Sequence, residues 1–500
     1  MAESYDVAVI GGGVIGCAIA HELSGYDLRV ILFERESDVA RGTSGKNSGV
    51  VHTGFNVPTG SLKAKFNVAG AALFEEYCRS LGVPFKRVGK LVVALTESDV
   101  PELDGLMARG RANGVPQLEI IGRDEVKRLE PRIAGVAAMH APTAAITCPY
   151  SLTIALAESA AANGVEVRLE SPVTRVHRLG HGYEVKTPAQ KVSATLVVNA
   201  AGLHSDRIAA LAGVDRWRIF PVRGEYAILD RARGDLITRM VYPVPPKGGA
   251  GLGVHLTPTV DGNILLGPTA AYIRSKNDTR TTAEVRRELL SEAAQLLPGI
   301  SAADVITAYS GIRPKLVSPG GGFADFIIEE APETPGMMHL VGIESPGLTA
   351  APAIGAHVGR WVLDRIPRSR RAPGNKKPAP VRFRGLSLEE RANLIEADPE
   401  YGRIVCRCEL ITEREVLDAI RNPLHARSLT SLKYRSRAMM GRCQGGFCGP
   451  RIVDILVEDG VDPASITLRG GESWMFVGSS RDVLRKAGSG EKEPVKAMKR

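Results

Sequence analysis

Residues 5–16, YDVAVIGGGVIG, decide the fold of this chain. The apolar run at their start predicts a β-strand, and Gly11, Gly13 and Gly16 complete the pattern G-x-G-x-x-G before an apolar helical stretch. In such a turn the first glycine permits the tight bend, the second lets a diphosphate approach the backbone, and the third lets the helix pack on the strand. The N–H groups and the positive dipole end of the helix favour the diphosphate. The pattern predicts an α/β, Rossmann-like dinucleotide-binding domain.

A second strand is expected over residues 28–33, and it ends at Glu34. A carboxylate at this place can accept hydrogen bonds from the ribose hydroxyls of an adenosine. The following segment 42–54, GTSGKNSGVVHTG, favours FAD over NAD. Its small and hydroxyl-bearing residues can lie flat against a large planar cofactor and donate N–H groups to it. We expect FAD contacts here from Thr43, Ser44, Asn47 and Ser48.

These motifs resemble those of the D-amino-acid-oxidase-like FAD oxidoreductases. The pattern T-S-G-x-N-S-G-V-x-H-x-G at 43–54, followed by GSLKAK at 60–65, looks most like the L-2-hydroxyglutarate and glycerol-3-phosphate dehydrogenase branches. Residues 197–206 look like a further flavin-domain strand and turn, and residues 342–350 like a flavin-contacting loop before a helix from about Ala353. The resemblance covers roughly residues 4–365. It implies further FAD contacts from Gly202, Gly347, Leu348 and Thr349.

The length of 500 residues exceeds one ordinary hydrophobic core, so two or three domains are expected. Residues 87–96, 217–229 and 253–267 have strand character, with a turn at 261–263, and residues 284–297 have helical character. We therefore expect an antiparallel-sheet substrate cap inserted into the FAD domain. The domain 1–365 would divide into FAD-binding parts at about 1–85, 145–210 and 335–365, and cap parts at about 86–144 and 211–334.

The net charge of +9 is partly carried by residues 368–384 and 485–500. We interpret residues 366–385 as a basic linker and residues 481–500 as a basic flexible tail. Nucleic-acid binding is not expected, because no interleaved aromatic residues or recognition motif accompany the charge. No apolar run is long enough to span a bilayer, and the N-terminus enters the first strand at once, so we expect a cytoplasmic protein. A basic surface could also dock on an anionic membrane or an acidic electron acceptor.

Four of the seven cysteines form two close pairs: Cys406 with Cys408, and Cys443 with Cys448. The others, Cys17, Cys78 and Cys148, are expected to be ordinary buried thiols. A cytosolic flavoprotein disfavours structural disulfides, whereas two thiol pairs can converge on a soft metal centre. Zinc is the alternative to iron, although neither pair has the C-x-x-C spacing of common zinc knuckles.

Residues 400–455 resemble the bacterioferritin-associated-ferredoxin-like two-iron two-sulfur domains. The C-x-C pair, the run R-x-x-M-G-R-C-Q-G-G-F-C at 437–448 and the following Gly-Pro carry this resemblance, and Met439 stands where glycine is expected. It implies a small helical C-terminal domain over about 386–480 and a [2Fe-2S] cluster on Cys406, Cys408, Cys443 and Cys448. A cluster passes single electrons onward, which favours a dehydrogenase with a quinone or protein acceptor over an oxidase.

Oxidation of an alcohol beside a flavin needs a base for the hydroxyl proton and cations for the anionic end of the substrate. His52 and, by resemblance, His255 are the candidate bases, and either could instead hydrogen-bond the flavin or the backbone. Arg313 is the candidate clamp for a carboxylate or phosphate, with a surface salt bridge as its alternative role. Further cations could come from Lys315, Lys63 and Lys65, of which the last two could simply be solvated.

The combination most resembles the large subunit of anaerobic-type glycerol-3-phosphate dehydrogenases. This resemblance implies oxidation of a small anionic alcohol, with electrons passing through FAD and a [2Fe-2S] cluster. The alternatives are L-2-hydroxyglutarate oxidation, oxidation of an amino-acid C–N bond, and a non-catalytic electron-transfer or assembly subunit. The sequence leaves open the acceptor, the partner subunits, which could hold the chain at the inner face of a membrane, and the oligomeric state.

Overall fold

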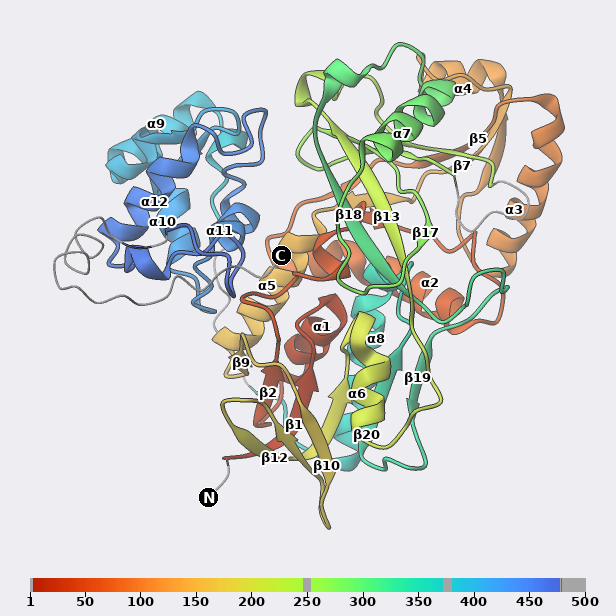
Figure 1. The fold of residues 1–500 in the computed structure, drawn as a ribbon. Helices are drawn as coiled ribbons and strands as arrows, with labels where there is room; N and C mark the ends of the chain where they lie inside the picture. The colour runs from red at the N-terminus through yellow and green to blue at the C-terminus, as the bar shows by residue number, and fades with distance from the viewer. Residues whose placement is uncertain (1–2, 246–252, 372–379, 477, 479–500) are drawn as a thin grey trace. The chain divides into compact units, whose positions relative to one another are not determined.

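The computed structural model describes residues 3–245, 253–371, 380–476 and 478. The chain forms two compact units, Met1–Val381 and Arg382–Arg500 (Figure 1). The second unit thus begins slightly before the expected boundary at 386. Residues 372–379 of the expected linker and the expected tail 481–500 lie outside the described residues. No helix within the described ranges combines the length and apolarity needed to cross a membrane.

The first sheet of the N-terminal unit has a parallel centre in the order β9-β2-β1-β12-β20. Its strands are β1 (Glu3–Ile10), β2 (Val30–Phe33), β9 (Glu166–Arg168), β12 (Lys191–Asn199) and β20 (Met337–Val341). Antiparallel strands β10 (Arg175–Arg178), β11 (Tyr183–Lys186) and β19 (Ile327–Glu330) extend it. Since β19 already pairs with β20, the chain returns to this sheet before the expected position of 335.

Helices cover this sheet and define its functional edge. Figure 1 shows α1 (Val14–Leu23) beside α5 (Pro149–Ala162) and α8 (Gly347–Arg365), while α2 (Leu62–Ser80) packs on α8. The short helix α6 (Ser205–Leu211) packs against β10, β12 and β20. The carboxyl ends of β1, β2 and β12 lead into Gly11, Glu34 and Ala200, so these loops meet at one edge of the sheet. This edge is where open α/β sheets bind ligands.

Helix α8 begins earlier than the sequence suggested. It starts at Gly347, not near Ala353, and Pro352 lies inside it. A proline is best tolerated in the first helical turn, where its missing N–H group costs no hydrogen bond, so Pro352 is a misleading start signal. The segment expected to be a flavin-contacting loop therefore presents the first turn of a helix.

The second large sheet of this unit is the cap, with strand order β17-β13-β16-β15-β14-β5-β7-β6 and β18 on β13. Most of its pairs are antiparallel, and β14 with β5 is parallel. The turn predicted at 261–263 joins β15 to β16, and the helix predicted at 284–297 is α7 (Ala283–Leu296). Its strands are β5 (Lys90–Ala94), β6 (Glu119–Gly122), β7 (Ala137–Ala141), β13 (Phe220–Leu229), β14 (Met240–Pro243), β15 (Leu256–Pro258), β16 (Ile264–Leu266), β17 (Ala271–Tyr272) and β18 (Val305–Lys315).

Two further groups of elements complete this unit. Helices α3 (Val100–Ala112) and α4 (Arg123–Leu129) pack on the cap strands β6 and β7. Within the glycine-rich segment 42–54, β3 (Val50–Val51) forms a small sheet with β8 (Ala145–Thr147) and β4 (Phe85–Arg87). The predicted Rossmann-like domain with an inserted, mostly antiparallel cap is confirmed.

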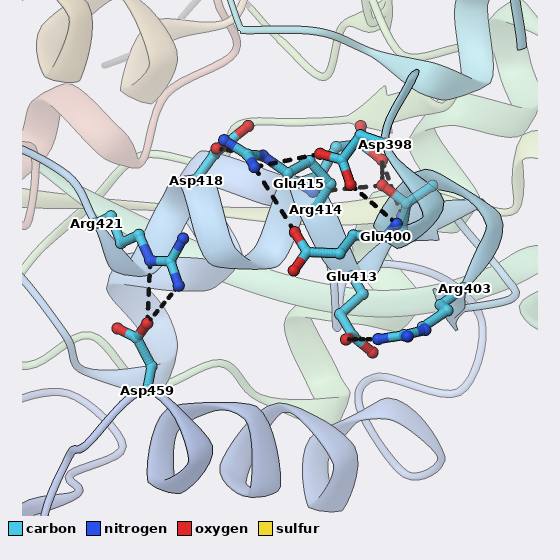
Figure 2. Close-up of polar contacts among 10 residues, drawn as sticks. Asp398, Glu400, Arg403, Glu413, Arg414, Glu415, Asp418, Arg421 and Asp459 are labelled. Atoms are coloured by element: carbon cyan, nitrogen blue, oxygen red, sulfur yellow. Dashed lines mark hydrogen bonds and ion pairs between the residues drawn. The ribbon is translucent and has the colours of Figure 1, made fainter. Parts of the chain in front are cut away.

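The C-terminal unit is small and mainly helical. It contains α9 (Leu388–Ala397), α10 (Glu413–Ile420), α11 (Leu429–Ser436), α12 (Cys448–Glu458) and the hairpin β21 (Ile404–Cys406) and β22 (Ile411–Thr412). Its apolar core brings α10, α11 and α12 around the buried Cys406 and Cys448. Ion pairs also stabilise α10. Arg414 pairs with Asp398 and, within the helix, with Asp418, and Arg421 pairs with Asp459 at the end of α12 (Figure 2).

Candidate functional site

A cavity of about 450 Å³ lies in the N-terminal unit, between the carboxyl edge of the first sheet and the cap. One end is lined by the glycine turn after β1 and by the end of β2, the other by residues of the cap strands. Most of the predicted site residues line it: Gly11, Gly13, Glu34, Thr43, Ser44, Asn47, Ser48, His52, Gly202, His255, Arg313, Lys315, Gly347 and Leu348. The cavity thus joins segments that lie far apart in the sequence.

The glycine turn has the geometry that a dinucleotide requires. Gly11 has φ +116°, and a Cβ atom there would lie 2.5 Å from the Ala200 carbonyl oxygen. A Cβ atom on Gly16 would lie 1.9 Å from the Gly11 carbonyl oxygen, so this glycine lies behind the cavity and permits close packing of α1. At Gly202 a Cβ atom would meet nothing within 4 Å, because the backbone there borders open space. Gly11 and Gly16 therefore permit close backbone packing in the turn, while the backbone at Gly202 leaves open space beside the cavity.

Glu34 is held by backbone N–H groups. Its Oε2 atom accepts a hydrogen bond of 2.7 Å from the Gly12 N–H, and its Oε1 atom one of 2.9 Å from the Glu36 N–H. Burial raises the pKa of Glu34, and the two N–H groups oppose that shift. The carboxylate keeps lone pairs for ribose hydroxyls, because each carboxylate oxygen can accept more than one hydrogen bond.

The polar side chains of the segment after β2 also shape the backbone. The Ser44 Oγ atom accepts a hydrogen bond of 2.8 Å from the Val14 N–H at the start of α1. The Thr43 hydroxyl donates 2.6 Å to the Ile312 carbonyl of the cap, and the Asn47 amide donates 2.8 Å to the Ser44 carbonyl. Thr349 lies fully buried behind the cavity, where its Oγ1 accepts from the His52 N–H at 2.9 Å. Thr349 therefore positions the histidine backbone.

Aromatic and basic side chains form the cap end of the cavity. His255 stacks on Tyr242 with ring centroids 3.6 Å apart and an interplanar angle of 8°. Among the described residues the Nδ1 atom of His255 has no hydrogen-bond partner. Burial, and then the nearby charge of Lys90, hold the pKa values of both His52 and His255 well below the usual range. Both imidazoles are therefore neutral near pH 7 and can accept a proton.

Arg313 lies on β18 and reaches into the same cavity. Its Nη2 atom donates 3.2 Å to the Thr269 carbonyl, and its guanidinium also hydrogen-bonds the Tyr226 hydroxyl. Within the described ranges Arg313 forms no ion pair, so its charge remains uncompensated beside the cavity. Lys315, two residues further along β18, lines the cavity as well.

Lys63 and Lys65 do not line the cavity. The ammonium of Lys63 forms a buried ion pair of 2.9 Å with Glu344, and Lys65 is exposed. Lys90 was missed by the sequence reasoning, although it opens β5 and its Nζ atom lies 3.3 Å from the Nδ1 atom of His52. No local sequence pattern marks Lys90 as buried, because its burial follows from contacts with residues distant in the chain.

In the C-terminal unit the cysteines meet in two pairs. The Cys408 and Cys443 sulfur atoms lie 3.6 Å apart. The Cys448 thiol donates a hydrogen bond to Cys406, which lowers the pKa of Cys406 to about 6. In the part of the chain that the structure describes, no three side chains of metal-binding type converge closely enough to hold a single ion. Cys17, Cys78 and Cys148 are separately buried, as predicted.

Met439 stands at a position that favours glycine. Its φ is +67°, a left-handed conformation in which a side chain is strained. The side chain packs into the core of the C-terminal unit, with its Cγ atom 3.1 Å from where a Cβ atom on Gly445 would lie. The departure therefore bears on the local backbone and packing at Met439.

Comparison with known proteins gives two family matches. Residues 6–361 match the FAD dependent oxidoreductases, and residues 404–458 match the BFD-like [2Fe-2S] binding domains. A glycerol 3-phosphate dehydrogenase of Caloramator mitchellensis is 39% identical over 487 residues, which cover 96% of this chain and 100% of that protein. A mitochondrial L-2-hydroxyglutarate dehydrogenase of Arabidopsis thaliana is 34% identical over 72% of this chain and 84% of its own length.

Among solved structures, the dithionite-reduced L-alpha-glycerophosphate oxidase of Mycoplasma pneumoniae with FAD bound is similar to this chain. Its TM-score is 0.69 at 32% sequence identity, and the match covers 75% of this chain and 98% of that one. The glycerol 3-phosphate dehydrogenase of Caloramator mitchellensis therefore matches across both units, whereas the other two relatives match about three quarters of the chain.

Proposed function

Because this chain belongs to the FAD dependent oxidoreductase family and ends in a BFD-like [2Fe-2S] binding domain, we propose that it oxidises sn-glycerol 3-phosphate to dihydroxyacetone phosphate. Membership of the family makes it an FAD-dependent oxidoreductase, and the substrate is the proposed part. The similarity to a glycerol 3-phosphate dehydrogenase over the full length of both chains carries the proposal. FAD, when bound, supplies the acceptor for the hydride of the substrate carbon.

The residues of the cavity fit FAD and an anionic alcohol. The turn at Gly11 and Gly13 would hold the diphosphate and Glu34 the ribose. Arg313 and Lys315 would bind the phosphate, because Arg313 has no competing carboxylate among the described residues and a guanidinium fork suits phosphate oxygens. His52 would take the hydroxyl proton, since it lines the cavity and burial keeps its imidazole neutral by lowering its pKa.

The cysteine geometry favours a [2Fe-2S] cluster over zinc. A single zinc ion would draw all four sulfur atoms to about 3.8 Å from one another, given tetrahedral Zn–S bonds of about 2.3 Å. Two separate pairs, Cys408 with Cys443 and Cys406 with Cys448, instead suit two irons with two thiolates each. We propose that Cys406, Cys408, Cys443 and Cys448 would hold this cluster, which would supply one-electron transfer toward a quinone or a redox protein.

Oxidation of L-2-hydroxyglutarate is the second candidate, because the N-terminal unit is also similar to an L-2-hydroxyglutarate dehydrogenase. That substrate carries two carboxylates, whereas glycerol 3-phosphate concentrates its charge on one phosphate. Arg313 and Lys315 lie together at one end of the cavity, which fits one phosphate better than two separate carboxylates.

An anaerobic screen of flavin absorbance tests these proposals. The purified protein is mixed with glycerol 3-phosphate, L-2-hydroxyglutarate and several amino acids, and bleaching of the flavin is followed. We expect bleaching with glycerol 3-phosphate at the lowest concentration. Preferential bleaching by another compound would replace the substrate, and no bleaching by any of them would favour an electron-transfer or assembly subunit.

A further inference from the structure

Lys90 is a buried basic residue to which the proposed function assigns no role. Its side chain is 1% exposed, and it does not line the cavity. Its Nζ atom lies 3.3 Å from the Nδ1 atom of His52, 4.1 Å from the ring centre of Tyr242 and 5.5 Å from that of Phe55. Among the described residues no carboxylate pairs with it. Within the described part of the chain, the imidazole of His52 is therefore the one hydrogen-bonding group found at the end of this lysine.

We propose that Lys90 is the positioning residue of the base: as a neutral amine it accepts the Nδ1 proton of His52 and so leaves the Nε2 atom free to take the substrate hydroxyl proton. The proposal deepens the proposed function and rests on His52 being the base there. In the proton step, the substrate O–H bond breaks and an Nε2–H bond forms on His52. The Nδ1–H bond then breaks, an Nζ–H bond forms, and the charge ends on the Lys90 ammonium.

The protonation state of Lys90 decides which tautomer His52 adopts. An ammonium has only donors, so it would donate to Nδ1 and leave the imidazole proton on Nε2, where it blocks the base. A neutral amine has one lone pair and can accept from Nδ1–H. Burial without a counter-ion penalises the ammonium and lowers the pKa of Lys90 to about 7. The two states therefore exchange within the pH range in which enzymes are ordinarily assayed.

Among the described residues no carboxylate pairs with Lys90, so no counter-ion reverses this preference. Tyr242 of β14 lies under the ammonium, and Tyr226 of β13 acts on Tyr242. The charges of Lys90 and of Arg313 on β18 both act on His255, which directly precedes β15, and Arg313 is a cation. Burial raises the pKa values of both tyrosines, so they stay neutral, and His255 is neutral because its pKa is lowered. The Tyr242 ring stabilises the ammonium through its face, which is a smaller effect than the desolvation of an unpaired charge.

Three variants separate a proton-accepting lysine from a merely structural one. Lys90→Met keeps the apolar stem and removes the amine, Lys90→Arg keeps a permanent cation, and Lys86→Met changes an exposed lysine four residues earlier as the control. The rate of anaerobic flavin reduction by glycerol 3-phosphate is measured from pH 5.5 to pH 9 for each. In the wild type we expect a rate that rises with pH through about 7, where Lys90 loses its proton.

The two Lys90 variants should differ in how their rate of flavin reduction depends on pH. Lys90→Met should lower the limiting rate by about 100-fold, which is the lower range of a general-base contribution. The rise of the rate with pH should move to more acidic pH, where buried His52 titrates alone. Lys90→Arg should stay inactive throughout, because a guanidinium cannot accept the proton. Lys86→Met should follow the wild type. A Lys90→Arg enzyme with wild-type rates at pH 8 would overturn the proposal.

A second measurement does not depend on turnover. With ¹⁵N-labelled histidine, the signals of His52 are assigned by their loss in His52→Gln, and the proton-bearing nitrogen is identified in the wild-type holoprotein at each pH. We expect Nδ1–H above about pH 8 and Nε2–H below about pH 6, and Nε2–H at every pH in Lys90→Arg. A wild-type tautomer that stays the same from pH 6 to pH 9 would refute the role of Lys90.

The two measurements also distinguish failure of the inference from failure of the proposed function. If the tautomer switches but glycerol 3-phosphate does not bleach the flavin, the substrate is wrong and the role of Lys90 stands. If bleaching occurs and His52→Gln retains the full rate, the base is wrong, and the inference falls with it. If bleaching needs His52 but Lys90→Arg leaves it intact, only the inference fails.

Discussion

The cavity region of the N-terminal unit and the outer surface of the C-terminal unit differ in whether their basic side chains form ion pairs. Arg313, which lines the cavity, and Lys90, which contacts His52, lie beside carbonyl groups, imidazoles and aromatic rings, and neither pairs with a carboxylate among the described residues. Around α10, by contrast, Arg414 and Arg421 each form an ion pair with an aspartate (Figure 2). A paired cation stabilises the fold, whereas a basic group without a counter-ion can bind an anion or, once it has lost its own proton, accept another. The contrast separates candidate functional residues from structural ones.

Removing the cluster should test whether the two units act independently. In Cys448→Ser we expect complete loss of the visible absorbance of the cluster and of at least half of the iron, because a serine hydroxyl is a poor ligand for a [2Fe-2S] iron. Flavin reduction by substrate should continue, since the cavity lies wholly in the other unit. Iron and labile sulfide analysis beside anaerobic reduction measures both, with Cys78→Ser as the control. One zinc per chain without sulfide would contradict the cluster.

Loss of the uncompensated guanidinium should have a large effect on catalysis and little on stability. A charge-assisted contact in a shielded pocket costs about 2–5 kcal/mol when its partner stays buried, so Arg313→Ala should lower kcat/KM by roughly 30-fold or more. Arg313→Lys should recover little, because the fork geometry is lost. The matched control is Arg233→Ala, which removes a cap arginine already paired with Asp304. Steady-state kinetics that do not change in Arg313→Ala would make this arginine structural.

In the C-terminal unit we expect the opposite for a buried carboxylate between two cations: its loss should lower the stability of the unit. Glu409 is 3% exposed and pairs with Arg384 at 2.7 Å and with Arg437 at 3.1 Å. Glu409→Gln should destabilise this unit by about 3 kcal/mol, because it removes the carboxylate charge from two buried ion pairs. Urea unfolding followed by cluster absorbance measures the loss.

Glu413→Gln provides the matched control for Glu409→Gln. The partners of Glu413, Arg403 and Arg451, are 63% and 40% exposed, so water can replace the lost carboxylate and the cost should stay below about 1 kcal/mol. Equal destabilisation in both variants would show that burial does not decide the contribution of these pairs.

The sequence predicted those features of the fold that depend on residues close together in the chain. The G-x-G-x-x-G turn was predictable because each glycine answers a local steric demand, and Gly11 and Gly16 meet those demands in the structure. The hairpin at 261–263 was predictable for the same reason. The start of α8 was not, because Pro352 is tolerated inside the helix by its surroundings, against the local preference.

The catalytic end of the cavity depended on contacts that no local pattern encodes. His52 and His255 could be named as candidates from residue type, but their proximity to Lys90 depends on contacts between segments distant in the chain. Lys63 shows the same dependence on distant contacts. The sequence offered it as a possible cation for the substrate, but it pairs with Glu344, nearly three hundred residues later in the chain. Long-range pairing thus decides which cations remain available for function.

The smallest effect is expected for the exposed pair of Arg421 and Asp459. Arg421 is 56% exposed, and Asp459 caps the C-terminal end of α12, where the helix dipole disfavours a carboxylate. Arg421→Ala should therefore cost at most about 1 kcal/mol, and Asp459→Ala less than that, because it also removes an unfavourable charge. A double-mutant cycle in urea should give a coupling of about 0.2–1 kcal/mol that shrinks in 1 M salt, since exposed charges are screened. A coupling of several kcal/mol that persists in salt would mean that even this surface pair behaves like the buried Glu409, and the contrast between the two regions would then rest on Arg313 and Lys90 alone.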